Sequence, residues 1–291
     1  MRFTKMQGVG NDFVVLDAAA LPEHILLPDL AIRLCNRNFG VGADGLLIVS
    51  PEPGSGVITM RMFNPDGTED TCGNGLRCVG LWAYRAGWLE DRTKVVVQTK
   101  DGAKTVRLLT SALPNIDSNQ GGGAMLGVDM GLPYLEPSRI PFAESSVTGR
   151  VVNWPLWVED REWPITSVNT GSTHTVIFGD APDEETFQRY SPLIENHPTF
   201  PERTSILWAT QKSATQFDVR IWERGVGETL GCGTGACAVG VAAQLTGLSQ
   251  LGMPLEIVSK GGVLQVTWPG EGKTVDMVGP AQFVFEGELC L

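Results

Sequence analysis

The chain has 291 residues, of which 42% are hydrophobic and 19% charged, with 35 glycines and 18 prolines. This length and composition predict two globular, turn-rich domains and exclude a disordered or coiled-coil protein. The net charge of -11 argues against nucleic-acid binding, which needs a concentrated positive surface. Six cysteines are too few for a disulfide framework in a chain of this length, so we expect free thiols in a reducing compartment.

The beginning of the sequence contains no apolar signal core, and no other stretch is apolar enough to span a membrane. We therefore expect a cytoplasmic protein with no membrane partner.

Apolar runs and alternating patterns predict more strands than helices. In the first half we expect helices at 27–36 and 75–86, and strands at 13–16, 45–49, 57–63, 94–99, 105–109 and 124–130. In the second half we expect helices at 183–195 and 235–245, and strands at 173–178, 217–222, 255–258, 263–268 and 282–285. The order of strand, glycine-rich turn and apolar helix occurs once in each half.

Two stretches rich in proline and glycine, 115–123 and 131–141, mark the expected domain boundary. The last strand is expected to return to the first domain, because the second copy looks complete before it. We predict an α+β fold of two pseudo-symmetric domains that arose by internal duplication, each a strand-rich mixed sheet around a central helix. The first domain would contain residues 1–122 and 277–291, and the second residues 123–276.

Two cysteine segments occupy the same register in the two halves, and Cys232 follows Cys72 by 160 residues. The same shift superposes further identical residues without a gap, namely Gly67 on Gly227, Gly73 on Gly233, Gly75 on Gly235, Val79 on Val239, Gly80 on Gly240, Ala83 on Ala243 and Gly87 on Gly247. A duplicated unit that faces its own copy would bring the two cysteines to one cleft. Two-base proton exchange requires this geometry.

Each cysteine is followed by a short turn that leads into a predicted helix, Gly73-Asn74 in the first half and Gly233-Thr234 in the second. The unpaired amides and the positive dipole end of a helix N-terminus favour an anion, so we expect a substrate carboxylate to bind there. The same potential favours a thiolate, which can act as a base while the opposite thiol acts as an acid. This chemistry needs no metal and no pyridoxal phosphate.

Two structural alternatives compete with this interpretation. A cysteine near the start of a helix is often only a small buried hydrophobic residue, as we expect for Cys35 and Cys290. Cys78 and Cys237 are expected to face the interior from their helices. A structural zinc site is disfavoured by the Cys-x5-Cys and Cys-x4-Cys spacings and by the glycines between the cysteines.

The cysteine segments belong to a series of motifs that runs through nearly the whole chain. The motifs are Met6-Gln-Gly-Val-Gly-Asn-Asp-Phe-Val14, Asn38-Phe-Gly-Val-Gly-Ala-Asp-Gly-Leu46, Phe63-Asn-Pro-Asp-Gly67, Cys72-Gly-Asn-Gly75, Phe200-Pro-Glu-Arg203, Glu223-Arg-Gly-Val-Gly-Glu-Thr229 and Cys232-Gly-Thr-Gly-Ala-Cys-Ala238. In kind and order they resemble the signatures of the diaminopimelate epimerases. These pyridoxal-independent enzymes interconvert LL- and meso-diaminopimelate on the route to lysine and peptidoglycan.

The resemblance implies an isomerase that acts on a small amino acid without a cofactor, commonly as a homodimer, with Cys72 and Cys232 as the acid/base pair. It implies that the amides after both cysteines hold the reacting carboxylate and that His174 lies near the reacting centre. Further substrate contacts are implied for Asn11, Asn64, Glu223 and Arg224, and Gly45, Ser172 and Ser205 are supporting positions.

Three departures from the family pattern concern the substrate. Ser172 and Ser205 stand where the family usually has asparagines expected to grip the distal end of diaminopimelate, and the interval from Asn64 to Cys72 is one residue shorter than usual. Serine is shorter and offers fewer hydrogen bonds than asparagine. A racemase of another amino acid, such as histidine, is therefore an alternative. A proline-racemase relative, a phenazine-type isomerase and a non-catalytic amino-acid-binding protein fit the cysteine pair less well.

Overall fold

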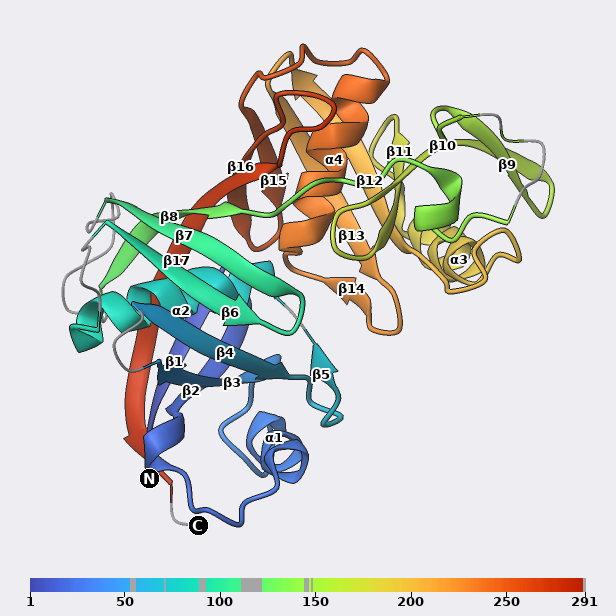
Figure 1. The fold of residues 1–291 in the computed structure, drawn as a ribbon. Helices are drawn as coiled ribbons and strands as arrows, with labels where there is room; N and C mark the ends of the chain where they lie inside the picture. Colours follow the sequence, from blue (N-terminus) through green and yellow to red (C-terminus); the bar gives the residue numbers. More distant parts are fainter. Residues whose placement is uncertain are drawn as a thin grey trace. The chain divides into compact units, whose positions relative to one another are not determined.

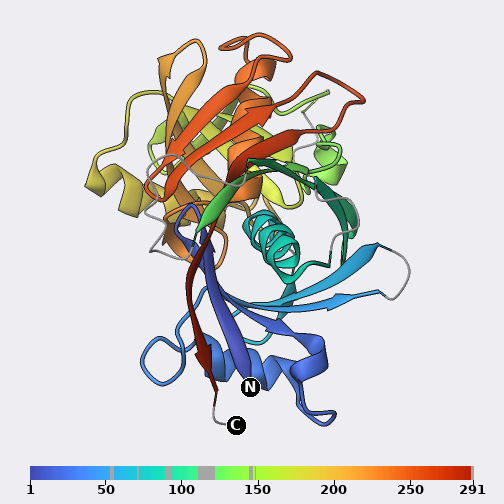
Figure 2. The same cartoon turned by 90° about the vertical axis from the view of Figure 1, so that its left-hand side faces the viewer.

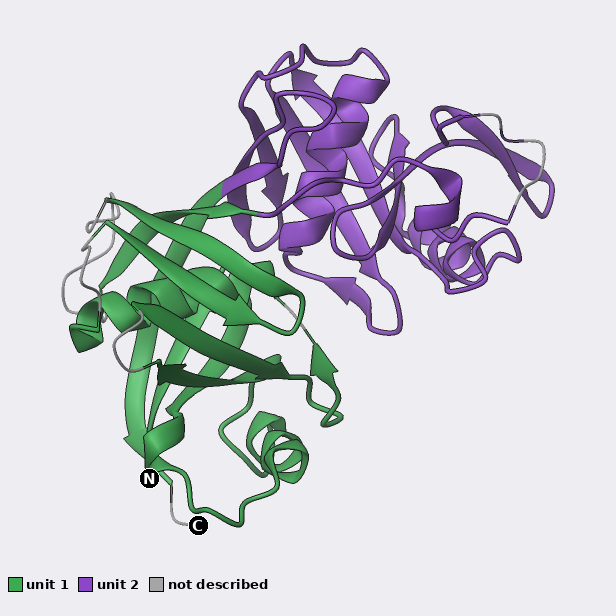
Figure 3. Ribbon diagram, viewed as in Figure 1, with its two compact units in different colours: residues 1–129, 278–291 green, residues 130–277 purple. Residues whose placement is uncertain are grey.

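The computed structural model describes residues 1–52, 56–70, 72–88, 93–110, 122–143, 147 and 149–289. The chain divides into two compact units, Met1–Asp129 with Val278–Leu291 and Met130–Met277 (Figure 3). The sequence placed the domain limits at 122/123 and 276/277, whereas the units divide after Asp129 and after Met277. Strand β8 (Gly123–Asp129) therefore lies in unit 1, and residues 115–121 of the expected boundary lie outside the described residues.

Unit 1 is a mixed sheet packed around helix α2 (Gly73–Ala86), with α1 (Leu27–Cys35) as a second helix. Parallel pairs β2–β3 and β4–β6 alternate with antiparallel pairs β1–β2, β3–β4 and β6–β7. Figure 2 shows α2, in teal, with strands of unit 1 around it, and α2 contacts strands from β1 to β8. The strands are β1 (Arg2–Gly8), β2 (Asn11–Asp17), β3 (Gly45–Pro51), β4 (Val57–Phe63), β5 (Glu69–Asp70), β6 (Lys94–Thr99), β7 (Gly102–Thr110), β8 and the part of β17 (Asp276–Glu288) from Val278 onward.

Unit 2 repeats this arrangement around helix α4 (Gly233–Leu245), with α3 (Glu184–Glu195) in addition (Figure 1). Parallel pairs β11–β12 and β13–β15 alternate with antiparallel pairs β10–β11, β12–β13 and β15–β16. The strands are β9 (Trp154–Val158), β10 (Arg161–Asn169), β11 (Thr173–Phe178), β12 (Ser205–Ser213), β13 (Gln216–Glu223), β14 (Gly227–Thr229), β15 (Leu255–Ser259) and β16 (Gly262–Thr267).

The duplication extends to the contacts between helix and sheet. A methyl group added at Gly80 of α2 would lie 2.6 Å from Val106 Cγ1, and one added at Gly240 of α4 would lie 2.6 Å from Val266 Cγ1. Gly240 and Val266 each follow their counterparts by the 160 residues that separate the two cysteines. Both halves therefore use glycine to bring the helix close to the sheet, which supports the predicted α+β duplication.

We expect Gly240→Ala to lower the free energy of unfolding by about 1–3 kcal/mol, because the new methyl group overpacks the contact with Val266. Urea denaturation measures the change, and Val266→Ala in the same chain should recover part of the loss. Gly179→Ala is the matched control, since a methyl group there meets nothing within 4 Å. Equal stability of the Gly240 and Gly179 variants would contradict the close approach.

The expected helices all form, and the two that follow the cysteines begin two residues earlier than predicted, at Gly73 and Gly233. The sequence patterns missed β1, β5, β9, β10, β12 and β14. Among the described residues, no helix is long and apolar enough to cross a membrane.

Candidate active site

Cys72 is the N-cap of α2, and its side chain is half-buried. Its extended backbone (φ -147°, ψ 118°) lets Sγ accept a hydrogen bond from the Gly75 amide at 3.5 Å. The thiol lies 3.5 Å from Asn11 Oδ1, which also accepts a hydrogen bond from Asn74 Nδ2 at 3.2 Å. Asn11, which belongs to another motif, thus lies beside the Cys72-Gly73-Asn74 turn at the start of α2.

A charged network fixes the orientation of the Asn11 amide. Asn11 Nδ2 donates to Asp44 Oδ2 at 2.9 Å, so Oδ1 must face the thiol. Arg37 bridges Asp44 and Asp12 at 2.7 and 2.8 Å, and Lys5 forms an ion pair with Asp12 at 2.6 Å. Burial alone would raise the pKa of Asp12, but hydrogen bonds from Arg37 and Lys5 lower it to about 2. Asp44 lies within the motif at 38–46 but was not among the predicted site residues.

Cys232 is the N-cap of α4, and a chain of hydrogen bonds connects it to His174. Cys232 Sγ accepts from the Gly235 amide at 3.4 Å and lies 3.4 Å from Thr234 Oγ1. Thr234 Oγ1 lies 3.2 Å from His174 Nε2, and His174 Nδ1 lies 2.7 Å from the Ser172 carbonyl oxygen. Since a carbonyl only accepts, Nδ1 carries the proton and Nε2 accepts from the Thr234 hydroxyl. Thr234 Oγ1 can then accept the proton of the Cys232 thiol.

His174 is buried, with 1% of its surface exposed. Burial is the main cause that lowers the pKa of His174 to about 4. The hydrogen bond to the Ser172 carbonyl raises this pKa, and the positive charge of Arg224 lowers it. The ring is therefore neutral at neutral pH, as the assigned hydrogen bonds require.

The neutral His174 predicts a pH dependence of stability. The unfolded chain binds the extra proton below about pH 6.5 and the folded chain only below about pH 4, so stability falls as the pH drops through this window. The expected loss is about 3 kcal/mol. Histidine ring NMR should show His174 neutral at pH 5, and His174→Gln, which also identifies the resonance, should remove this part of the pH dependence. A His174 ring that titrates near pH 6.5 would contradict the prediction.

The remaining predicted residues of unit 2 lie around the hairpin between β13 and β14. Ser205 begins β12 and stands in register with His174 on the parallel strand β11. Its hydroxyl accepts a hydrogen bond from the Arg224 amide at 3.1 Å, and Arg224 Nη1 donates to the Glu202 carbonyl at 3.0 Å. Glu223 accepts a hydrogen bond from Thr229 across the hairpin. Glu223, Arg224 and Ser205 therefore occupy one corner of this unit.

Two further predicted residues of unit 1, Asn64 and Gly45, make contacts within that unit. Asn64 lies in the turn after β4, where its side-chain amide donates to Thr68 Oγ1 at 3.1 Å. Gly45 begins β3, and an added methyl group there would lie 2.8 Å from Met62 Cε. The close contact with Met62 is enough to explain why position 45 has a glycine.

Cys35, Cys78 and Cys237 are also free cysteines, and all are buried. Burial raises the pKa of Cys35 to about 11 and that of Cys78 to about 12, so both remain protonated thiols. Cys72 and Cys232 differ from them in standing at helix N-caps.

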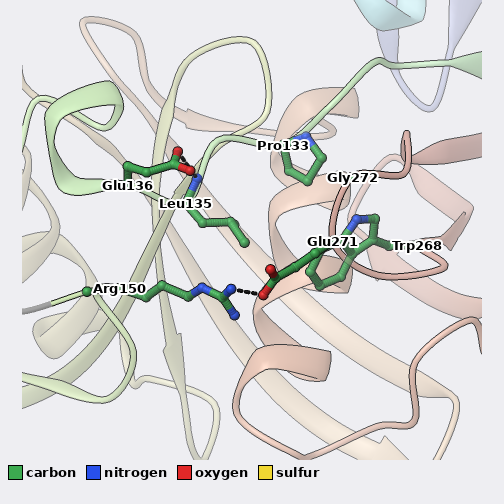
Figure 4. Close-up of a pocket in the computed structure, with 8 residues that line it drawn as sticks. Pro133, Leu135, Glu136, Arg150, Trp268, Glu271 and Gly272 are labelled. Carbon is green, nitrogen blue, oxygen red and sulfur yellow. Dashed lines mark hydrogen bonds and ion pairs between the residues drawn. The ribbon is translucent and has the colours of Figure 1, made fainter.

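A separate pocket of about 270 Å³ in unit 2 contains none of the predicted site residues (Figure 4). An ion pair between Arg150 and Glu271 crosses it, and Trp268 and Leu135 line its wall. Over the described ranges, no three His, Cys, Asp or Glu side chains are grouped to hold a metal ion.

Comparison with solved structures identifies the fold. A phenazine biosynthesis protein of the PhzF family from Bacillus anthracis superposes with a TM-score of 0.64 at 18% identity, over 100% of this chain and 99% of its own. A probable proline racemase from Agrobacterium radiobacter superposes with a TM-score of 0.68 at 14% identity, over 100% and 93%. The chain is thus a two-unit α+β protein of the fold shared by these proteins, with a cysteine-capped helix in each unit.

The amino-acid sequence identifies the family within this fold. The profile of the diaminopimelate epimerase family matches residues 3–122 and 166–284. A diaminopimelate epimerase of Acaryochloris marina is 42% identical over 288 residues, which cover 99% of this chain and 98% of the relative. The chain belongs to the diaminopimelate epimerase family, as the motifs predicted.

Proposed function

We propose that this protein interconverts LL- and meso-diaminopimelate and that Cys72 and Cys232 are its acid and base. The observation that carries the proposal is the presence of both cysteines as N-caps of the duplicated helices, in a chain 42% identical to a diaminopimelate epimerase over nearly its full length. A protein that only binds an amino acid needs neither thiol.

In the proposed reaction one thiolate removes the proton from the α-carbon, and the opposite thiol delivers a proton to the other face. Negative charge grows on the substrate carboxylate as the proton leaves. The first-turn amides of α2 and α4, at Gly73, Asn74, Gly233 and Thr234, would stabilise that charge more in the transition state than in the ground state.

Each cysteine has an oxygen that can accept its proton in a hydrogen bond, besides the helix amide that donates to its sulfur. Thr234 and Asn11 each present an oxygen to the neighbouring thiol, and each oxygen is fixed by a further hydrogen bond. Loss of the Cys232 proton would allow the Thr234 hydroxyl to rotate and donate to the thiolate. No metal or organic cofactor takes part in this mechanism.

The distal end of the substrate would be recognised by the corner that contains Glu223 and Arg224, whose charges complement an ammonium and a carboxylate. Ser205 supports this corner, since its hydroxyl holds the Arg224 amide. Serine at this position is therefore compatible with diaminopimelate as substrate, although it offers fewer hydrogen bonds than asparagine.

The test is to incubate the protein with LL-diaminopimelate and, separately, with a panel of L-amino acids that includes histidine and proline, and to follow α-proton exchange by NMR. We expect exchange and inversion with diaminopimelate. Exchange only on a member of the panel would refute the substrate and favour a racemase of that amino acid.

We also propose that the protein is cytoplasmic and forms a homodimer. Light scattering coupled to size-exclusion chromatography tests the dimer, and a monomer mass of 31.4 kDa at working concentration would refute it.

A further inference from the structure

Glu195 is a buried acidic side chain that no motif singled out. It is the last residue of α3, and 5% of its surface is exposed. Its carboxylate accepts hydrogen bonds from Trp222 Nε1 at 2.8 Å, the Gly225 amide at 2.8 Å and Arg203 Nη1 at 3.1 Å. The donors come from a strand, a turn and a loop that are separated in sequence from the helix.

These bonds grip the residues on either side of the Glu223–Arg224 pair. Oε2 holds Trp222, directly before Glu223, and Oε1 holds Gly225, directly after Arg224. The turn itself is closed by the Val226 amide, which donates to the Glu223 carbonyl at 3.0 Å, and Gly225 adopts a left-handed φ of 77°. One carboxylate therefore holds both residues that flank Glu223 and Arg224.

The backbone next to Arg203 joins the same arrangement. The Thr204 amide donates to the Glu195 carbonyl oxygen at 3.3 Å, and Arg203 has a left-handed φ of 61°, which is uncommon outside glycine. Ser205 follows directly and accepts from the Arg224 amide. Glu195 thus connects the segment before Ser205 to the turn that presents Arg224.

A buried carboxylate at the end of a helix destabilises the fold unless hydrogen-bond donors surround it. The C-terminal end of a helix repels a negative charge, and a buried carboxylate must be satisfied by donors. Packing alone would be served by an apolar side chain, because Trp222 already packs against Phe187 with ring centroids 5.7 Å apart.

We infer that Glu195 is a positioning residue that sets the turn through which Glu223 and Arg224 contact the substrate. The inference rests on the proposed function of these two residues. Glu195 does not touch the substrate. It acts through the residues that flank the pair.

The test compares Glu195→Gln with the unaltered protein. Glutamine has the same shape but turns an NH2 group toward one of the donors, so one charge-assisted hydrogen bond is lost. We expect the KM for LL-diaminopimelate to rise about tenfold, with a smaller fall in kcat. The NMR resonances of the Gly225 amide and the Trp222 indole should shift.

Glu159→Gln is the matched control, because Glu159 is an exposed acid of the same unit that bonds to Arg189. It should leave both KM and the two resonances unchanged. Trp222→Phe is a second variant for the case in which Glu195→Gln does not fold. It removes one donor to the carboxylate and keeps Glu195, so it should also raise KM.

Shifted resonances with an unchanged KM would overturn the inference, and so would unshifted resonances. If the unaltered protein does not act on LL-diaminopimelate, the proposed function fails first, and the link from Glu195 to the substrate fails with it. The two resonances still report separately whether Glu195 holds the turn.

Discussion

Replacement of either Cys72 or Cys232 by alanine is expected to lower the rate of epimerisation by at least about a thousandfold, because each removes one of two groups that must move a proton. Both thiols cap a helix and accept an amide hydrogen bond, from Gly75 and Gly235 respectively. Two residues that act as one unit are not additive, so the double variant should be hardly slower than either single variant. NMR detection of meso-diaminopimelate measures the rates.

Cys35→Ala is the control for these variants. Cys35 is a buried thiol whose pKa is raised by burial to about 11, so it remains protonated and takes no part in the proposed reaction. Its removal should leave the rate within a small factor of that of the unaltered protein. Full activity of either the Cys72 or the Cys232 variant would refute the two-base mechanism.

The second large effect is expected at Arg77, whose guanidinium is completely buried in unit 1. It donates to Asn74 Oδ1 at 2.7 Å, to the Pro280 carbonyl at 3.1 Å and to the Gly73 carbonyl at 3.5 Å. Arg77→Leu should lower the free energy of unfolding by about 3 kcal/mol, because these acceptors lose their donors in a buried place. Urea unfolding followed by circular dichroism measures the loss.

Arg77→Leu should also slow catalysis, since Arg77 fixes the Asn74 amide that bonds to Asn11 beside Cys72. Arg85→Leu on the same helix is the control. Arg85 pairs with Glu286 at a more exposed place, so its loss should cost no more than about 1 kcal/mol. If both variants were equally stable, the buried hydrogen bonds of Arg77 would not contribute as described.

The sequence predicted the helices and the cysteines just before them because these features are local. A glycine-rich turn followed by an apolar periodicity indicates a helix start without knowledge of the rest of the chain. The family motifs implied substrate contacts for Asn11 and Thr234, and the structure places the Asn11 side chain beside Cys72 and that of Thr234 beside Cys232.

The missed strands contain polar or charged residues where the pattern of a strand leads us to expect apolar ones. β1 reads Arg2-Phe-Thr-Lys-Met-Gln-Gly8, and both Thr4 and Lys5 are buried, Lys5 through its ion pair with Asp12. β10 contains Pro164 and charged residues at its start, which weaken the signal of a strand. Lys5 also donates to the Gly42 carbonyl, and Thr4 accepts from Trp82 Nε1. Such partners lie far away in the chain, so a window of sequence cannot reveal them.

The same limit applies to Glu195 and Asp44. Each is one acidic residue among 33 in the sequence, and its importance arises from donors elsewhere in the chain. Only the folded arrangement identifies them as supports of the candidate site.

The most direct test of the two-base mechanism is the early reaction of LL-diaminopimelate in D2O, with product and remaining substrate both analysed by mass spectrometry and NMR. The thiol that protonates the new face carries deuterium from the solvent, whereas the thiolate that removed the proton can return only that proton. We therefore expect one deuterium in each meso product, at the inverted carbon, and none in the remaining LL substrate. A product without deuterium, or equal labelling of substrate and product, would contradict the mechanism.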